Sequence, residues 1–200
     1  MSNLKETILN PILKGNPITV LVLGICSSLA VTVQLKGALV MALSVTIVTG
    51  LSSLVVSLLR NTIPNRVRII VQLVVVAMMV ILVDQVLKAY AYAIDKQLSV
   101  YIGLIITNCI VMGRIEAFAL GNKPIPSLLD GLANGVGYGL ILIIVAFFRE
   151  LLGSGTLLGM RVLPAGYIPN NLVILPPFAL ILLGCIIWVH RAFDKDLQEK

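Results

Sequence analysis

The sequence predicts an all-α membrane protein whose six transmembrane helices form two inverted three-helix repeats, and three observations support this fold class. The 200 residues are 58% hydrophobic and only 12% charged, with a mean hydropathy of +1.04. That charged share is about half of what globular domains carry. The hydrophobic residues form six runs separated by turn-forming or charged segments. The first and fourth runs are the shortest, which is typical of matching positions in two inverted halves.

The lengths of the runs indicate where the helices are incomplete. The six runs are 18–33, 37–59, 69–90, 99–113, 129–148 and 172–189. A helix that crosses about 30 Å of hydrocarbon needs about 20 residues, so we expect the first and fourth spans to be short or broken. Three is an odd number, so the second half starts from the opposite side of the membrane. We therefore expect a single integral membrane domain at 1–200, with repeat 1 at about 12–90 and repeat 2 at about 97–192.

The basic residues are read here as topology signals. If the N-terminus lies inside, ten of the 15 Lys and Arg residues fall in inside segments and five in outside segments. This asymmetry predicts a multi-pass protein with both termini in the cytoplasm. The net charge of +6 is scattered between hydrophobic runs, so we expect contact with membrane lipid and none with nucleic acid.

The fourth run carries an unusual group of residues, read as IITNCIVMGRIEAFA at 105–119. Cys109 follows Thr107 and Asn108, and an Asn side chain in hydrocarbon needs a partner from protein or water. Arg114 and Glu116 are costly in hydrocarbon unless they lie at an interface or a cavity. The segment is therefore expected to be short or broken, with a site built around Cys109.

Cys26 lies in a similar setting in the first run, and three interpretations of the two cysteines are open. A buried free cysteine most often packs as a small hydrophobe, which is the interpretation we give to Cys185. A disulfide between Cys26 and Cys109 is a second possibility. The third is a metal site, because a metal deprotonates a thiol and compensates its charge. A two-iron cluster needs four cysteines, and His190 stands alone, so another chain would have to supply two more.

Four polar residues beside these cysteines are candidates for supporting roles. Side chains next to a ligand can donate hydrogen bonds to cluster sulfurs and so adjust the redox potential. By this argument the candidates are Ser27, Ser28, Thr107 and Asn108.

Other features have simpler explanations. Gly131, Gly135 and Gly139 recur every four residues, which predicts close packing of another helix, within this chain or with a partner. The glycine-rich segment at 153–159 is expected to be a turn, because no βαβ unit surrounds it.

Four charged residues lie near the ends of spans. Asp84 is expected to pair with Lys88 one helical turn away. Arg149 and Glu150 are expected to form an interfacial pair at the end of the fifth span.

Several segments together carry a resemblance to a known family: GICSSLAVT, IPNRVRIIVQL, VDQVLKAYAYAIDKQLSVYIGLIITNCIVMGRIEAFA, DGLANGVGYG and IIVAFFRELLGSG. They resemble the membrane subunits shared by the bacterial sodium-translocating NADH:quinone oxidoreductase and the Rnf electron-transport complex. The resemblance covers about 16–159 and is specific, because ITNCIVMGR followed by EAFA is not a generic membrane pattern. VDQVLKAYAY and AFFRELLGSG are more similar to the quinone reductase member. The resemblance does not extend to the segment 160–177.

The resemblance implies a redox role. In this family two membrane subunits of inverted topology each contribute two cysteines to one intramembrane [2Fe-2S] cluster. By motif, the ligands here would be Cys26 and Cys109, and the partner would be the homologous inverted-topology membrane protein of the complex, its E subunit. The family also implies a six-subunit complex of the bacterial inner membrane that passes electrons from NADH to ubiquinone and moves sodium outward. FAD, FMN, riboflavin and ubiquinone are expected in other subunits, so this chain would belong to a translocase without having an active site of its own.

Two rival functions remain open. One is the corresponding Rnf subunit, in a ferredoxin:NAD complex, which the activity of the parent complex would distinguish. The other is a small secondary transporter of the 3+3 inverted type, which should tolerate Cys→Ser changes at Cys26 and Cys109.

Overall fold

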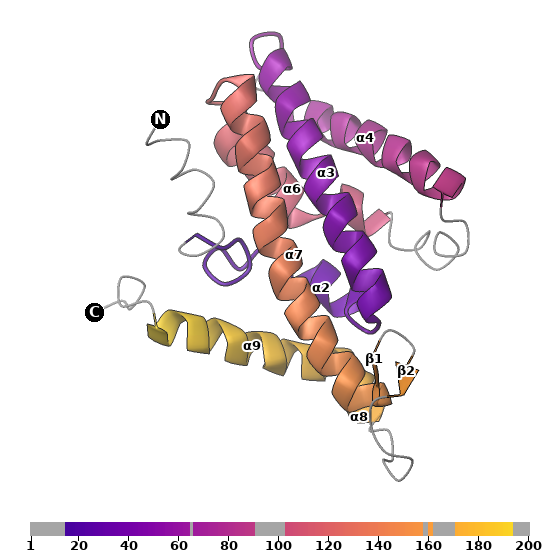
Figure 1. Ribbon diagram of the computed structural model, residues 1–200. Helices are drawn as coiled ribbons and strands as arrows, with labels where there is room; N and C mark the ends of the chain where they lie inside the picture. The colour runs from indigo at the N-terminus through magenta and orange to yellow at the C-terminus, as the bar shows by residue number, and fades with distance from the viewer. Residues whose placement is uncertain (1–14, 65, 91–102, 158–159, 162–170, 194–200) are drawn as a thin grey trace.

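The computed structural model describes residues 15–64, 66–90, 103–157, 160–161 and 171–193, and these are almost entirely helical, as predicted (Figure 1). The elements are the helices α2 (Ile25–Val31), α3 (Leu35–Leu59), α4 (Arg68–Tyr90), α6 (Cys109–Arg114), the π-helix η1 (Ile115–Ala119), α7 (Pro124–Ser154), strands β1 (Thr156–Leu157) and β2 (Met160–Arg161), and helices α8 (Asn171–Ile174) and α9 (Pro176–Phe193). The two strands pair antiparallel as a small hairpin after α7.

Four of the described helices are long and apolar enough to cross a membrane. They are Leu35–Leu59, Arg68–Val86, Pro124–Ser154 and Pro176–Phe193. They correspond to the second, third, fifth and sixth predicted spans, whereas the first and fourth spans contain only short helical pieces among the described residues.

The ends of the fifth and sixth spans differ from the prediction. Helix α7 begins at Pro124 and has 31 residues, because proline is compatible with the first helical turn, where its missing N–H has no intrahelical partner. It ends at Ser154 and is C-capped by Gly155, which adopts the left-handed conformation at φ 66°. The turn predicted for 153–159 is therefore wrong in its extent, because Gly153 and Ser154 are helical and Thr156–Leu157 form β1. Helix α9 begins at Pro176, after the separate short helix α8.

Helices α3 and α7 form the central antiparallel pair (Figure 1). A Cβ atom added at Gly139 would lie 2.9 Å from the Cβ of Ala42, and one added at Gly135 would lie 2.6 Å from the Cα of Thr46. One added at Gly131 would lie 2.9 Å from the backbone oxygen of Thr49 on α3. The glycine repeat therefore packs within this chain, as one of the two predicted alternatives stated.

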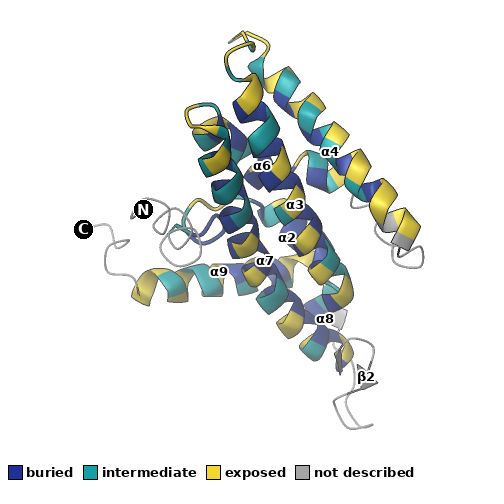
Figure 2. Cartoon of the chain, turned by 45° about the horizontal axis from the view of Figure 1, so that its top comes forward, coloured by how far each residue is buried: buried dark blue, intermediate teal, exposed yellow. Residues whose placement is uncertain are grey.

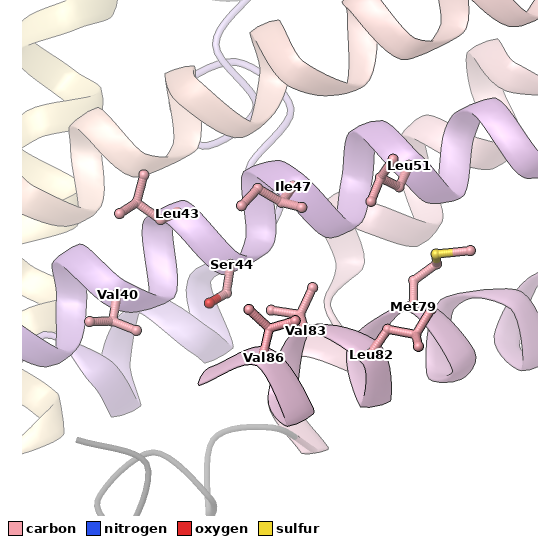
Figure 3. A pocket seen from close by; sticks show the side chains of 9 residues that line it. All are labelled: Val40, Leu43, Ser44, Ile47, Leu51, Met79, Leu82, Val83 and Val86. Atoms are coloured by element: carbon pink, nitrogen blue, oxygen red, sulfur yellow. The ribbon is translucent and has the colours of Figure 1, made fainter. Parts of the chain in front are cut away.

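Helices α4 and α9 lie on the outside of this pair, and much of their surface is exposed (Figure 2). A groove of about 460 Å³ separates α4 from α3 (Figure 3) and is lined by Val40, Leu43, Ser44, Ile47, Leu51, Met79, Leu82, Val83 and Val86. Ser44 is the single polar residue in this lining. A ligand site normally adds a few converging polar groups to orient its ligand, so the groove has the character of a lipid-facing surface.

The charged residues of the fourth span and of α4 have partners. Glu116 in η1 forms an ion pair with Arg68 and accepts a hydrogen bond of 2.7 Å from Gln72. Lys88 and Asp84 are 2.6 Å apart, as the one-turn spacing predicted. These contacts join η1 to α4 and compensate charges that would be costly alone.

Candidate metal centre

The first predicted span is interrupted immediately before Cys26. Residues 17–20 form turns, and the backbone of Val22 and Gly24 then adopts positive φ values of 55° and 80°. Gly24 occupies the N-cap position of α2, so Cys26 is the second residue of that helix. Positive φ is strained for a β-branched residue such as Val22. In the structure the Cys26 side chain is exposed.

The fourth span is interrupted at the equivalent place, before Cys109. Residues 103–106 are helical, and Asn108 then adopts an extended conformation. Its side-chain oxygen accepts a hydrogen bond of 3.1 Å from the backbone N–H of Ile110, which is the usual role of an N-cap asparagine. Cys109 is the first residue of α6, and its side chain is also exposed.

The two interruptions contact each other. The Asn108 amide donates to Ser27 Oγ at 3.4 Å, across 81 residues of sequence. Ser27 Oγ lies 2.8 Å from the hydroxyl of Tyr138 on α7. A Cβ at Gly24 would lie 2.7 Å from Ile110 Cδ1 and 3.2 Å from Tyr138 Cε2. The fold therefore brings the helix starts that carry Cys26 and Cys109 together, against one face of α7.

The predicted supporting residues are placed as follows. Ser27 Oγ donates to the Gly24 carbonyl oxygen at 3.0 Å, and Ser28 Oγ donates to that of Ile25 at 2.7 Å. Thr107 Oγ1 donates to the Gly103 carbonyl oxygen at 3.1 Å. A hydroxyl has one hydrogen to donate. In this conformation all three hydroxyls thus satisfy backbone carbonyl groups at the interruptions.

The far end of α2 is held by Arg149, which is fully buried in α7. Its guanidinium donates to the Leu29 carbonyl oxygen at 3.0 Å and to Thr32 Oγ1 at 2.6 Å, and it also reaches the carbonyl oxygens of Val173 and Ile174 on α8. A cation at carbonyl groups that end a helix is favourable.

The neighbouring Glu150 caps a different helix. Its carboxylate accepts a 2.6 Å hydrogen bond from the backbone N–H of Leu35, the first residue of α3. The prediction that Arg149 and Glu150 form an interfacial pair is therefore wrong. Both are buried, because each satisfies backbone groups at helix ends that water would otherwise have to reach.

The far end of α6 is held by an ion pair. Arg114 donates to both carboxylate oxygens of Asp130 on α7, with distances of 3.0 and 2.5 Å. The Asn134 amide donates to the same carboxylate at 3.1 Å. Helix α7 therefore contacts the far ends of both short helices as well as their starts.

The exposed thiols set what the site can do chemically. Among the described residues, no group of three or more His, Cys, Asp and Glu side chains is placed to hold a metal ion. Two cysteines match half of the four-thiolate set that a two-iron cluster requires, so a cluster here fits only with two ligands from another chain. Exposure alone does not define the site, because Cys185 is exposed too. The prediction that Cys185 packs as a buried small hydrophobe is therefore wrong. Cys185 lines a groove between α7 and α9, away from any helix interruption.

Sequence reasoning missed two residues of this arrangement, Asp130 and Tyr138, and gave Arg149 a different partner. All three lie in α7, and hydropathy identified the part that carries Asp130 and Tyr138 only as a span. One signal was available, because Asp130, Asn134 and Tyr138 recur every four residues and so share one helix face.

The fold and the site together define a class: an all-helical membrane protein in which two interrupted helices present a pair of thiols. The chain belongs to the Rnf-Nqr family of membrane protein subunits, whose family model matches residues 4–187.

Individual relatives agree with this assignment. The chain is 57% identical over 201 residues to the D subunit of the Na(+)-translocating NADH-quinone reductase of Haemophilus influenzae, a match that covers 98% of this chain and 97% of that protein. It is 58% identical over 205 residues to the protein of the same description from Aeromonas salmonicida, covering 100% of this chain and 98% of the relative. These relatives are subunits of a translocase complex, and the resemblance found in the sequence is confirmed.

Proposed function

We propose that this chain is a membrane subunit of a bacterial sodium-translocating NADH:quinone oxidoreductase and lies in the inner membrane with both termini in the cytoplasm. The identity of 57% and 58% to two such subunits, over nearly the whole chain, supports the proposal. The excess of Lys and Arg in the inside segments supports the orientation. FAD, FMN, riboflavin and ubiquinone belong to other subunits of the complex in this proposal.

The second part of the proposal assigns Cys26 and Cys109 as half of the ligands of a [2Fe-2S] cluster. The homologous E subunit provides the other two cysteines. The observation that carries this part is the placement of two exposed thiols at the starts of two interrupted helices that contact each other. When bound, such a cluster supplies a one-electron carrier inside the membrane.

The chain's own residues hold the thiols in place. Asn108 fixes the start of α6 through Ile110, and Ser27 joins that start to α2. Ser28 and Thr107 satisfy carbonyl groups close to the thiols, which is necessary because an interrupted helix in a membrane leaves backbone groups without internal partners.

The proposed architecture is that of six spans in two inverted three-helix repeats. In this arrangement the interrupted span of α2 corresponds to that of α6, α3 to α7, and α4 to α9. Two features support it: the interruptions precede the cysteine in both halves, and α3 runs antiparallel to α7. Inverted halves place corresponding helices in opposite directions.

Rival functions have less support. A transporter of the 3+3 type would need polar groups around a substrate, whereas the groove between α3 and α4 is apolar apart from Ser44. The Rnf alternative shares the family, but the relatives described above are NADH-quinone reductase subunits.

The test is an iron and acid-labile sulfide determination on the purified complex. The variants are Cys26→Ala and Cys109→Ala, and Cys185→Ala is a matched control because its thiol is also exposed in a helix. We expect each of the first two to lose about two irons per complex together with NADH:quinone activity, and the control to keep both. Unchanged iron in Cys26→Ala and Cys109→Ala would refute the cluster assignment. A parent complex that reduces NAD with ferredoxin would favour the Rnf alternative.

A further inference from the structure

Tyr138 stands at the centre of the contacts between the two cysteine-bearing helix starts. Its side chain is fully buried in the middle of α7. Its ring packs against Gly24, and its hydroxyl lies 2.8 Å from Ser27 Oγ. The amide of Asn108, the residue before Cys109, donates to the same Ser27 Oγ at 3.4 Å. Tyr138 thus bonds the residue after Cys26 directly, and that serine also bonds the residue before Cys109.

The direction of the hydrogen bond between Tyr138 and Ser27 follows from counting hydrogens. The one hydroxyl hydrogen of Ser27 goes to the Gly24 carbonyl oxygen. Ser27 Oγ therefore has only acceptor capacity left, and it accepts from the Asn108 amide and from the Tyr138 hydroxyl. The Asn108 contact is long at 3.4 Å, so the 2.8 Å bond from Tyr138 is the stronger of the two.

We propose that Tyr138 is a positioning residue of the metal centre: its hydroxyl, acting through Ser27, fixes the helix start that carries Cys26 against the one that carries Cys109. This inference rests on the proposed function. Without the Tyr138 hydroxyl, Ser27 Oγ still donates to the Gly24 carbonyl oxygen, but it accepts only the long hydrogen bond from Asn108. The two helix starts then lose a shared buried anchor, while the aromatic ring still fills its place against Gly24.

The variant that isolates this hydroxyl is Tyr138→Phe, tested in the whole purified complex. Loss of the bond to Ser27 loosens the helix start that carries Cys26, and a cluster's potential depends on the surroundings of its ligands. We expect a shifted midpoint potential and a broader electron paramagnetic resonance signal of the reduced cluster, with iron content retained. The matched control is Thr49→Val, which removes a buried hydroxyl that, among the described residues, bonds its own helix through the Val45 carbonyl oxygen at 2.6 Å. The control should leave potential and signal at their wild-type values.

A second variant tests whether Tyr138 acts through Ser27. Ser27→Ala removes the acceptor of the hydrogen bond from Tyr138. It also provides the test if the complex with Tyr138→Phe does not assemble. In the Ser27→Ala background, adding Tyr138→Phe should shift the potential no further, because coupled residues are not additive. A potential and signal that stay at wild-type values in both single variants would overturn the inference, and so would two fully additive shifts.

This failure is distinguishable from failure of the proposed function. If Cys26→Ala and Cys109→Ala complexes keep their iron, the cluster assignment itself is wrong. If those complexes lose iron but Tyr138→Phe leaves the potential and the signal unchanged, only the role of Tyr138 is wrong.

Discussion

Two stripes of residues run side by side along α7 and meet different neighbours. The glycine stripe consists of Gly131, Gly135 and Gly139. It faces α3 at distances that leave no room for a Cβ atom. The polar stripe consists of Asp130, Asn134 and Tyr138. It meets the two short helices, through Arg114 at one end and Ser27 at the other.

The difference between the stripes reflects what each neighbour requires. Helix α3 is uninterrupted along 25 residues, and its interior backbone groups pair within the helix, so close approach through small residues is sufficient for packing along its length. The short helices α2 and α6 begin inside predicted spans, where unpaired backbone and polar groups have no water. Polar side chains of α7 are therefore needed there. In this chain the glycine stripe marks structural packing, and the polar stripe marks the place of the candidate site.

The largest effect is expected from breaking the glycine stripe with Gly135→Val. The new Cβ would lie 2.6 Å from the Cα of Thr46, and a backbone atom cannot move aside as a flexible side chain can. Helices α3 and α7 would have to separate. We expect a loss of about 3 kcal/mol or more, at the upper end of overpacking effects. The measurement is the amount of this chain recovered in the complex, together with the apparent Tm.

The control for this change is Gly184→Ala on α9, where a Cβ would meet nothing within 4 Å. It should assemble as wild type, and alanine is the better helix former by about 1 kcal/mol. If Gly135→Val assembled with an unchanged Tm, the close contact between α3 and α7 would be wrong.

The next largest effect is expected at Arg149, which extends the contacts of α7 to the C-terminal end of α2. Arg149→Gln removes a charge that binds three backbone carbonyl groups and Thr32. Leaving such groups unsatisfied costs about 1–3 kcal/mol, so we expect a loss of roughly 2–3 kcal/mol, seen as a lower apparent Tm. Arg149→Lys should lower the stability less than Arg149→Gln, because lysine keeps the positive charge although it lacks the planar guanidinium group.

Arg191→Gln is the control for the same side-chain change at an exposed position. Within the described part of the chain, Arg191 makes a long contact of 3.5 Å to the Val20 carbonyl oxygen, so we expect a change below about 0.5 kcal/mol. Equal Tm losses at Arg149 and Arg191 would contradict the helix-capping role of Arg149.

The sequence was sufficient to predict the long helices and the interruptions, because both depend on the length of hydrophobic runs. It was not sufficient for the ends of α7. Hydropathy placed the end of the fifth span at Phe148, since Arg149 and Glu150 look like surface residues. Their burial depends on helix ends that lie more than 100 residues away in sequence, and no local pattern reveals those partners.

The candidate site was predicted in the same partial way. Cys26, Cys109 and Asn108 stood out because their own short runs are unusual. Tyr138 did not, since a tyrosine in an apolar helix has no meaning until the fold places a partner opposite it. Its partner Ser27 is 111 residues away, and only the tertiary packing of α7 against both short helices connects them.

The smallest expected effect concerns backbone strain in the interruption before Cys26. Substitutions at two nearby positions there should change the apparent Tm in opposite directions. Val22 has φ 55°, which costs a β-branched residue about 1–3 kcal/mol. Glycine adopts this conformation freely but has more unfolded-state entropy to lose, about 0.4–1 kcal/mol. Val22→Gly should therefore raise the apparent Tm slightly, by the equivalent of about 1 kcal/mol.

Gly24→Ala is the opposite change in the same segment. It places a Cβ at φ 80° and 2.7 Å from Ile110 Cδ1, so it should lower the Tm. It should also disturb the contact between the two helix starts, which would appear as a broader electron paramagnetic resonance signal of the proposed cluster in its reduced state. If Val22→Gly lowered the Tm as much as Gly24→Ala does, the left-handed turn would not be the source of strain. The packing of the Val22 side chain would then stabilise the fold by more than the backbone strain destabilises it. Packing would dominate at this interruption, as it does along the glycine stripe.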